Sequence, residues 1–514
     1  MKQGADTTGL PGWPHLPPLN TPNKKSSLIM TDPGCRCLCM GLSIHYPYYV
    51  ETSALEHEIP GECSTCFSRS QKTRFRDYLS QAILPAMDVS ISWLDAGEAL
   101  SLSVSGLAIE QLLGAENDAA DILMQLMQHR SVEILGQTYY RSVAGLFSET
   151  DEFISQVSRH AELMDGLFGR RPKIFENTEF VFNSGLTDAV RSLGFSALYS
   201  EGYETTFPVL NQNYVYSCHG LPILIRNCRL SDDIAHRFGD ATWDRYPLSP
   251  EKYAGWLAET PGDCIHIRLD AGIFSGAACD NRALGQFFQV LPEALCAKDI
   301  ITVLPSEVSR NPPQEEIRLE DLGLVSSDRA YALTGIRNIF QQSAFWCLED
   351  ARYLIPDKES WRRFQSTDHF SRMDTISGSC GRVAVRSTSQ EAYDYFTAYL
   401  TALARCEAAC LDESRCPPAA QALRCLPPDK AFHFHSGHRF IGYSAYSLKE
   451  FSRLLEFIPE EVFLFHQERG DFSRWIDEIL GDSTLAERIK YCTSLHEAAD
   501  LARGRGRELC NQVK

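Results

Sequence analysis

The sequence predicts an α/β protein built on a parallel β/α barrel, followed by a helical region and a small C-terminal α+β module. Three observations lead to this prediction. Short apolar runs alternate with helical patterns from about residue 37, the strand signal fades after about residue 330, and prolines precede a final segment. Strands that alternate with helices are typical of parallel sheets, and seven or eight of them favour a barrel over a sandwich.

The strands are expected where short β-rich apolar runs occur. These runs are Leu38–Ile44, Leu100–Val104, Val132–Leu135, Lys173–Phe175, Ser196–Tyr199, Ile223–Ile225, Cys264–Leu269 and Ile300–Leu304. Helical patterns lie between many of them: apolar residues between 119 and 127 recur at spacings of three and four, which indicates an amphipathic helix. Ser231, Asp232 and Asp233 can supply capping side chains and therefore predict a helix that begins before Ile234–Phe238.

The chain has 514 residues, too many for one average domain. Residues 1–34 are rich in Pro and Gly and lack apolar periodicity, which predicts disorder. We expect the barrel over residues 35–325 and the helical region over 326–416. A Pro-rich linker is expected over 417–430, and an accessory module over 431–514.

Charge and hydropathy exclude several classes of partner. The net charge of −18, without a Lys/Arg run, argues against nucleic acid and anionic membranes. No stretch of about 18 apolar residues occurs, so no membrane span is expected. A neutral substrate such as a polysaccharide is compatible with this charge.

Cysteine usage and the N-terminal residues predict a cytoplasmic location. The 18 cysteines are not evenly paired, and a chain of this size does not need disulfides to stabilise its core. We interpret most of them as free thiols in a reducing compartment. Residues 1–29 lack the apolar core of a signal peptide.

Three polar residues follow predicted strands and are candidates for chemistry. His45 follows the first run, Glu179 follows the fourth at a distance of four residues, and Asp270 follows the seventh. In a parallel barrel, the residues at the carboxyl ends of strands surround the active site. Each signal is weak by itself, because a carboxylate at a strand end is more often a helix cap or an ion-pair partner.

The order of several motifs is more specific. The motifs are His45-Tyr46-Pro47, Glu133 with Tyr139-Tyr140, Asn177-Thr178-Glu179-Phe180, Asp270 with Phe274, and Ser366-Thr367-Asp368-His369-Phe370. Together they resemble the α-amylase-like branch of glycoside hydrolase family 57 over residues 37–410. The resemblance implies an incomplete, seven-stranded β/α barrel whose cleft is completed by the helical region.

The resemblance also implies a reaction. Glu179 would be the nucleophile and Asp270 the acid/base of a retaining hydrolase or glucanotransferase that acts on α-1,4-glucan or maltooligosaccharide. Such a mechanism needs two carboxyl groups about 5–5.5 Å apart and neither a metal nor an organic cofactor.

Further residues are expected to bind the sugar. The predicted substrate-binding residues are His45, Glu133, Tyr140, Trp243, Asp368 and His369. The imidazoles and carboxylates would hold sugar hydroxyls or orient the catalytic pair. The aromatic rings would stack on sugar faces, and the alternative for each ring is packing inside the protein.

The motifs also depart from the family pattern. Gly272 stands where a second acid is usual, Gln137 and Arg141 replace a Glu and a His, and Tyr46 replaces a Gln. Supporting residues hold catalytic groups in position. The alternative is therefore that the chain is a catalytically weak or inactive member of the family that acts as a glycan-binding or regulatory protein.

Two clusters of cysteines and histidines could bind metal ions, but an ordinary structural role is preferred for both. The cysteines at 35, 37, 39, 63 and 66 could hold zinc or, at 63 and 66, form a redox pair. Alternation along a strand would point Cys37 and Cys39 to one face, which favours buried thiols. His433, His435 and His438 are better explained as a half-buried strand with exposed imidazoles.

Overall fold

The computed structural model describes residues 36–51, 66–67, 70–115, 118–180, 184–201, 211–276, 281–317, 338–375 and 388–513. The predicted disordered segment, Cys35 and Cys63 lie outside these residues. Within them, no helix is both long enough and apolar enough to cross a membrane.

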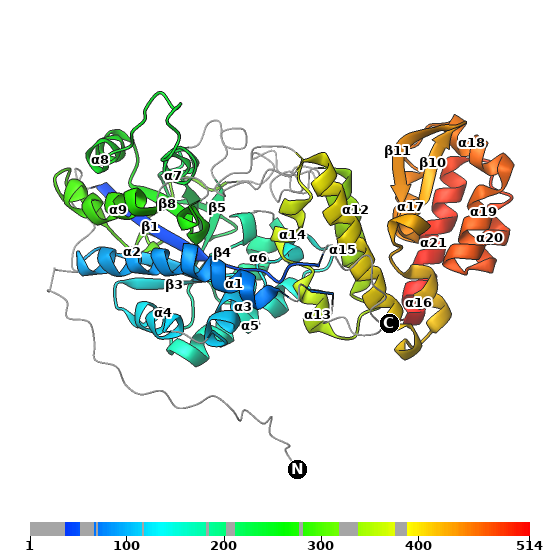
Figure 1. The fold of residues 1–514 in the computed structure, drawn as a ribbon, viewed down its shortest axis with the longest axis horizontal. Helices are drawn as coiled ribbons and strands as arrows, with labels where there is room; N and C mark the ends of the chain where they lie inside the picture. The colour runs from blue at the N-terminus through cyan, green and yellow to red at the C-terminus, as the bar shows by residue number, and fades with distance from the viewer. Residues whose placement is uncertain are drawn as a thin grey trace, which may run out of the picture.

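Seven parallel strands form the barrel, which confirms the predicted fold class (Figure 1). They are β1 (Arg36–Ile44), β2 (Leu100–Val104), β3 (Val132–Gly136), β4 (Ile174–Glu176), β5 (Ala197–Glu201), β7 (Leu221–Arg226) and β8 (Cys264–Asp270). Their spatial order is β7-β5-β4-β3-β2-β1-β8. A short β6 (Tyr216–Cys218) runs antiparallel beside β7, and β9 (Ile300–Thr302) pairs with the start of β1.

The barrel closes loosely between β7 and β8. The Asn227 amide just after β7 donates to the His266 carbonyl on β8 at 2.9 Å, although no ladder joins the two strands among the described residues. On its other side β8 is paired with β1 over seven residues, from Cys37 opposite Cys264 to Ser43 opposite Asp270. This register brings the first and last long strands of the barrel together, so that Asp270 ends beside Ser43.

Alternate residues of each strand face the barrel interior, and this interior contains buried charged and polar side chains. Arg268 on β8 forms a buried ion pair with Glu176 on β4 and donates to Ser101 on β2 at 2.7 Å. Its guanidinium occupies the space beside Gly41, where a Cβ atom would lie 1.4 Å from Arg268 Nη1. The absence of a side chain at Gly41 therefore makes room for a cation that spans the barrel.

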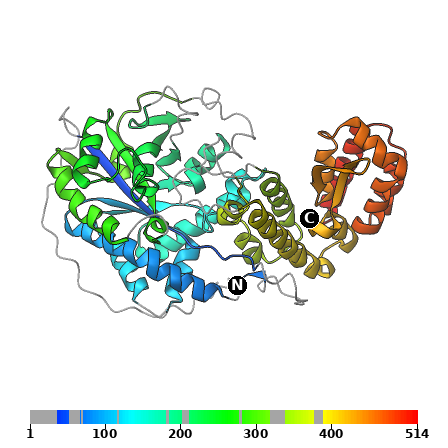
Figure 2. The ribbon, with the colours of Figure 1, turned by 45° about the horizontal axis from the view of Figure 1, so that its top comes forward.

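Helices cover the outside of the strands (Figure 2), and short helical turns lie at the strand ends. They are α1 (Gln71–Tyr78), η3 (Leu79–Ile83), α2 (Leu84–Asp95), α3 (Gly106–Leu113), α4 (Ala119–Gln128), η4 (Val143–Leu146), α5 (Asp151–Phe168), η5 (Thr178–Phe180), α6 (Ser184–Ser192), α7 (Cys228–Ala235), α8 (Pro250–Glu259), η6 (Ala271–Phe274), α9 (Asn281–Cys296) and α10 (Pro305–Val308). The predicted apolar stripe of α4 is buried at Leu123, Leu126 and Met127. However, α7 begins earlier than its three capping candidates suggested, because the Asn227 side chain accepts from the Leu230 amide and caps the helix directly after β7.

A helical region follows the barrel and packs against its β4–β5 side. It comprises α12 (Ile339–Ala351), α13 (Lys358–Arg363), α14 (Thr367–Arg372) and α15 (Ser389–Ala409). Its buried Trp361, Phe364 and Tyr399 share one core with Phe175 of β4 and Leu198 of β5. A main-chain bond from Val143 to the Gln365 carbonyl ties the start of α14 to the loop after β3. This contact brings residues 366–368 to the strand ends.

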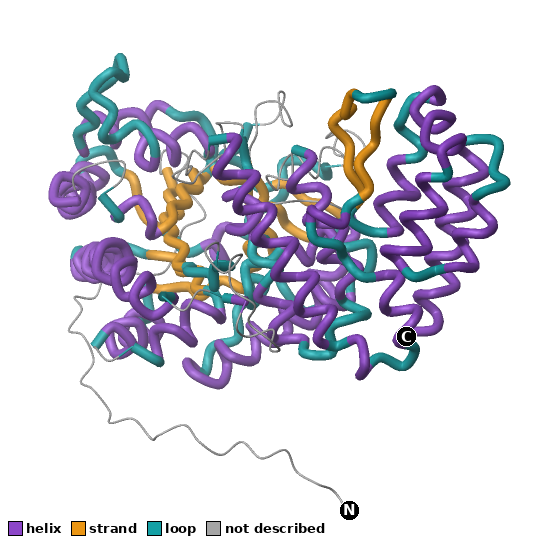
Figure 3. The backbone as a smooth tube through the Cα atoms, turned by 45° about the vertical axis from the view of Figure 1, so that its right-hand side comes forward, coloured by secondary structure: helices purple, strands orange, loops and turns teal. Residues whose placement is uncertain are grey.

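The C-terminal module contains a β-hairpin and helices (Figure 3). A short η7 (Leu411–Glu413) precedes it. Its elements are α16 (Pro417–Leu423), η8 (Pro428–Lys430), β10 (Phe432–Ser436), β11 (Arg439–Ala445), α17 (Leu448–Leu454), α18 (Glu460–Arg469), α19 (Asp471–Trp475), η9 (Ile476–Leu480), α20 (Ser483–Ile489) and α21 (Leu495–Val513). Phe463, Phe472 and Trp475 fill the core of this module.

The expectation of a linker over 417–430 was wrong. Pro417 lies in the first turn of α16, where its missing N–H costs nothing, and Ala419, Ala422 and Leu426 pack into the module core. On the other side of the module, Lys449 of α17 bridges to Asp350 at 2.6 Å at the end of α12. The module therefore begins at about residue 417 and is attached to the helical region by ionic contacts of Lys449 and by packing of Tyr446 against Phe396.

Candidate active site

Asp270 stands at the carboxyl end of β8, where it accepts hydrogen bonds at both oxygens. Its Oδ1 accepts from the Gly272 amide at 2.8 Å, and its Oδ2 accepts from Ser43 Oγ at 3.1 Å. Arg141 Nη1 lies 3.5 Å from Oδ2, and one fifth of the Asp270 side chain is exposed. A Cβ atom at Gly272 would lie 3.0 Å from Oδ1, so this glycine allows its amide to approach the carboxylate closely.

Glu179 stands beyond the end of β4 in a strained turn. Its φ angle of 54° is uncommon for a residue other than glycine, and such strain is concentrated at functional sites. The Thr367 hydroxyl lies 3.2 Å from Glu179 Oε1, within hydrogen-bonding distance. Thr367 comes from α14, so the helical region supplies a direct contact to this carboxylate.

Arg141 connects the surroundings of the two carboxylates. Its side chain reaches Asp270 and donates to Ser43 Oγ at 3.2 Å, while its main-chain carbonyl accepts from the Thr367 amide at 3.1 Å. Thr367 in turn reaches Glu179. Arg141 also has a positive φ of 49° and is buried. The sequence marked Arg141 only as a departure, because its contacts join segments that are far apart in the chain.

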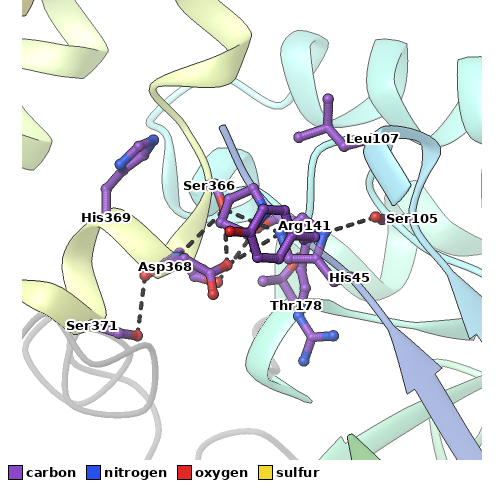
Figure 4. A network of polar contacts seen from close by, with 12 residues as sticks. His45, Ser105, Leu107, Arg141, Thr178, Ser366, Asp368, His369 and Ser371 are labelled. Atoms are coloured by element: carbon purple, nitrogen blue, oxygen red, sulfur yellow. Dashed lines mark hydrogen bonds and ion pairs between the residues drawn. The ribbon is translucent and has the colours of Figure 1, made fainter. Parts of the chain in front are cut away.

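His45 and Asp368 form a second polar contact beside Arg141 (Figure 4). His45 Nε2 lies 3.2 Å from Asp368 Oδ2 and 3.3 Å from Ser366 Oγ, and its Nδ1 lies 2.7 Å from Ser105 Oγ. The imidazole is buried, whereas one fifth of the Asp368 side chain is exposed. The structure therefore brings both residues to the strand ends, with the Asp368 carboxylate nearer to solvent.

Three tyrosines line the same region, of which the sequence singled out only Tyr46. The ring of Tyr46 packs 4.9 Å from Tyr78 and 5.8 Å from Tyr49, measured between centroids. Burial raises the pKa of Tyr46 to about 12, and the pKa of Tyr78 is raised by burial and by the negative charge of Asp270. These phenols keep their protons at neutral pH and can donate hydrogen bonds.

Glu133 and His369 are engaged elsewhere. Glu133 faces the barrel interior from the start of β3, and its Oε2 accepts from the Ser306 amide at 2.8 Å. The Glu133 pKa is raised by burial. The His369 ring points away from Asp368 in Figure 4, toward Tyr395 Oη at 2.8 Å and the Arg363 carbonyl at 2.9 Å. These contacts engage both side chains within the protein.

Tyr140 and Trp243 also do not line the site. The Tyr140 ring is 1% exposed, and its hydroxyl donates to Glu359. Trp243 is half-buried on the outer side of the barrel, with its ring 5.9 Å from Trp256 of α8. Both rings pack against other parts of the protein, which was the alternative to stacking on sugar faces.

The described members of the two suggested metal clusters lie apart from this site. Cys37 and Cys39 both face the barrel interior, as strand alternation predicts, and Cys66 Sγ contacts Cys406 Sγ at 3.5 Å. His433 is exposed on β10 and bonded to Ser444, in agreement with a half-buried strand. Within the described part of the chain, no potential metal cluster includes these histidines.

The fold and the site together define a β/α-barrel enzyme with acidic groups at the carboxyl ends of its strands. The family model described as glycosyl hydrolase family 57 matches residues 41–320, more than half of the chain. The chain therefore belongs to glycosyl hydrolase family 57, as the motifs suggested.

The chain is similar to several individual proteins and structures. A protein of Methanocaldococcus jannaschii named putative alpha-amylase is 28% identical over 347 residues, which are 65% of this chain and 73% of that protein. The crystal structure of 4-alpha-glucanotransferase from Thermococcus litoralis matches with a TM-score of 0.53 at 12% identity and shares the fold. That match covers 80% of this chain but only 62% of the glucanotransferase. A family 57 branching enzyme from Pyrococcus horikoshii also matches, with a TM-score of 0.47 at 11% identity over 76% of this chain and 91% of that one.

Proposed function

We propose that this protein is a retaining glycosidase or glucanotransferase that acts on α-1,4-linked glucan, with Glu179 as nucleophile and Asp270 as acid/base. The observation that carries the proposal is the position of Arg141. Its side chain contacts Asp270 at the end of β8, and its carbonyl binds Thr367, which reaches Glu179 beyond β4. Arg141 thus contacts one carboxylate, Asp270, directly and reaches the other, Glu179, through Thr367.

The proposed reaction has two steps. Glu179 attacks the anomeric carbon while Asp270 gives its proton to the departing glycosidic oxygen, and a glycosyl-enzyme ester forms. Asp270 then takes a proton from water or from a sugar hydroxyl, whose oxygen displaces Glu179. The acceptor decides between hydrolysis and transfer, and the relatives named alpha-amylase and 4-alpha-glucanotransferase represent both outcomes.

The surrounding residues have separate tasks in this proposal. Ser43 and the Gly272 amide fix the Asp270 carboxyl group, and Thr367 holds one oxygen of Glu179. The exposed part of Asp368 accepts a sugar hydroxyl, and His45 holds Asp368 in place from its buried side. Tight placement of both carboxylates matters because small displacements of catalytic groups are costly.

The test is turnover of maltooligosaccharide by the purified full chain, with hydrolysis and transfer products separated by chromatography. Glu179→Gln and Asp270→Asn should each abolish product formation. The matched control Glu110→Gln, which alters a carboxylate of α3 that contacts Tyr139 and Arg159, should retain it. In Glu179→Ala, added azide should restore reaction and give a glycosyl azide of inverted anomeric configuration, because azide attacks from the face that Glu179 leaves. Activity that survives in Glu179→Gln would contradict the proposal.

A glycan-binding protein without turnover is the second candidate. It is favoured by one observation, the replacement of the usual supporting residues by Arg141 and Gly272, both of which now contact Asp270 directly. Maltooligosaccharide binding by calorimetry that is equal in wild type, Glu179→Gln and Asp270→Asn, with no product from any of them, would select this candidate.

A further inference from the structure

The barrel interior holds a cluster of side chains that the proposed reaction does not use. Cys39 of β1 and Cys264 and His266 of β8 are all buried, and one ligand atom from each lies within 4.8 Å of the others. The β1–β8 register creates this cluster, because Cys39 is opposite His266 and Cys37 is opposite Cys264. Within the described ranges, this is the group of His, Cys, Asp or Glu residues that could hold a metal ion.

The sulfur separation fits two ligands of one tetrahedral ion. Cys39 Sγ and Cys264 Sγ are 3.7 Å apart. Two sulfurs bound to Zn²⁺ at about 2.3 Å with tetrahedral angles lie roughly 3.8 Å from each other. A disulfide would instead require about 2.05 Å.

The imidazole is also held as a metal ligand is held. The Tyr199 hydroxyl lies 3.0 Å from His266 Nδ1, and both side chains are buried. Histidines that bind metals usually have a second polar contact of this kind, which fixes the orientation of the ring. Cys37 faces the same interior opposite Cys264. Its sulfur is not among the atoms that lie within 4.8 Å of one another, so Cys37 would have to turn toward the other three ligands to supply a fourth.

We propose that Cys39, Cys264 and His266, completed by Cys37, form a structural Zn²⁺ site inside the barrel. The site would join β1 to β8, the strand that is only loosely attached to β7 on its other side. His266 precedes Asp270 by four residues, or about 13 Å along the strand, so the ion would stabilise the strand without taking part in sugar chemistry.

The site differs from the zinc site that the sequence suggested. That alternative grouped Cys37 and Cys39 with cysteines at positions 35, 63 and 66, whereas the structure brings in two ligands from β8. These partners are more than 220 residues away in the sequence, since Cys39 and Cys264 are 225 positions apart. Local spacing could not reveal them.

The experiment measures metal bound to the full chain after expression with added Zn²⁺ and dialysis. About one Zn²⁺ per chain is expected, and its removal by a strong chelator should lower the melting temperature. Cys39→Ala with Cys264→Ala should lose the metal, whereas the control Cys218→Ser, which alters a buried cysteine on β6, should retain it.

Spectroscopy on the wild-type protein keeps the test independent of whether the double variant folds. X-ray absorption at the zinc edge should show sulfur at about 2.3 Å and nitrogen at about 2.0–2.1 Å. The Co²⁺-substituted protein should show thiolate-to-cobalt charge transfer. Wild-type protein without stoichiometric metal, retention of Zn²⁺ by the double variant, or a Cys39–Cys264 disulfide found by mass spectrometry would each overturn the proposal.

Discussion

Substitution of Gly41 by alanine is expected to destabilise the barrel from within. The new methyl group would lie 1.4 Å from Nη1 and 2.4 Å from Cζ of Arg268, so the guanidinium has to move. Its ion pair with Glu176 and its hydrogen bond to Ser101 would both be broken, and all of these side chains are buried.

The cost can be worked from these contacts. Disrupting a buried ion pair so that one charge is left uncompensated costs about 3–5 kcal/mol, a large part of the roughly 5–15 kcal/mol that stabilises a typical protein. We therefore expect Gly41→Ala to lower the free energy of unfolding of the barrel by about 3–5 kcal/mol. Urea denaturation followed by circular dichroism, together with hydrogen exchange in β1 and β8, measures this change.

Gly285 in α9 provides the matched control. A Cβ atom there would meet no atom within 4 Å, so Gly285→Ala should leave stability unchanged or raise it by about 0.5–1 kcal/mol. If the free energy of unfolding of Gly41→Ala is within about 1 kcal/mol of the wild-type value, the substitution has not broken a buried ion pair. That result would refute the role given to Arg268.

Three further predictions follow from single side chains. Thr367→Val removes the hydroxyl that reaches Glu179 and should lower kcat about tenfold, the effect of roughly 1.4 kcal/mol, with little change in melting temperature. Burial lowers the pKa of both His160 and His369 to about 4. The unfolded chain therefore binds more protons than the folded chain below about pH 6.5. The free energy of unfolding should fall by about 3 kcal/mol per histidine as the pH drops from there toward about 4. Urea titrations at several pH values measure this fall. A pH-independent midpoint would contradict this. Tyr140→Phe should cost about 1–2 kcal/mol of stability yet leave KM for maltooligosaccharide unchanged, since the ring is buried; a large rise in KM would restore its predicted role in substrate binding.

The strands could be predicted because their pattern is local. The expected run Cys264–Leu269 became β8 (Cys264–Asp270), and Leu38–Ile44 became β1 (Arg36–Ile44). Strands buried on both faces read as continuous apolar runs, and such runs are visible without any partner. The short antiparallel β6 was not predicted, because three residues give no periodic signal.

Helix boundaries were harder where one residue type has two roles. The prolines at 417 and 418 were interpreted as a linker, although proline is also favoured in the first turn of a helix, and here they begin α16. Asn227 was overlooked as the cap of α7 in favour of three residues farther along the chain. Only the position of the preceding strand decides between such candidates.

In the candidate site, too, local features could be predicted and features set by distant contacts could not. Asp270 and Glu179 were found because each follows a strand run, a local feature. Glu133 and His369 satisfied the motifs equally well, but the direction of a side chain depends on distant partners such as Ser306 and Tyr395. The contact of Arg141 with Asp270 spans 129 positions and has no local signature.

Trapping of the glycosyl-enzyme with a 5-fluoro-maltosyl fluoride, followed by peptide mass spectrometry to map the label, tests directly whether Glu179 is the nucleophile. We expect one 5-fluoromaltosyl group per chain on Glu179, with slow release when an acceptor sugar is added and no label in Glu179→Gln. A label on any other residue, or turnover of maltooligosaccharide with inversion of configuration, would contradict it.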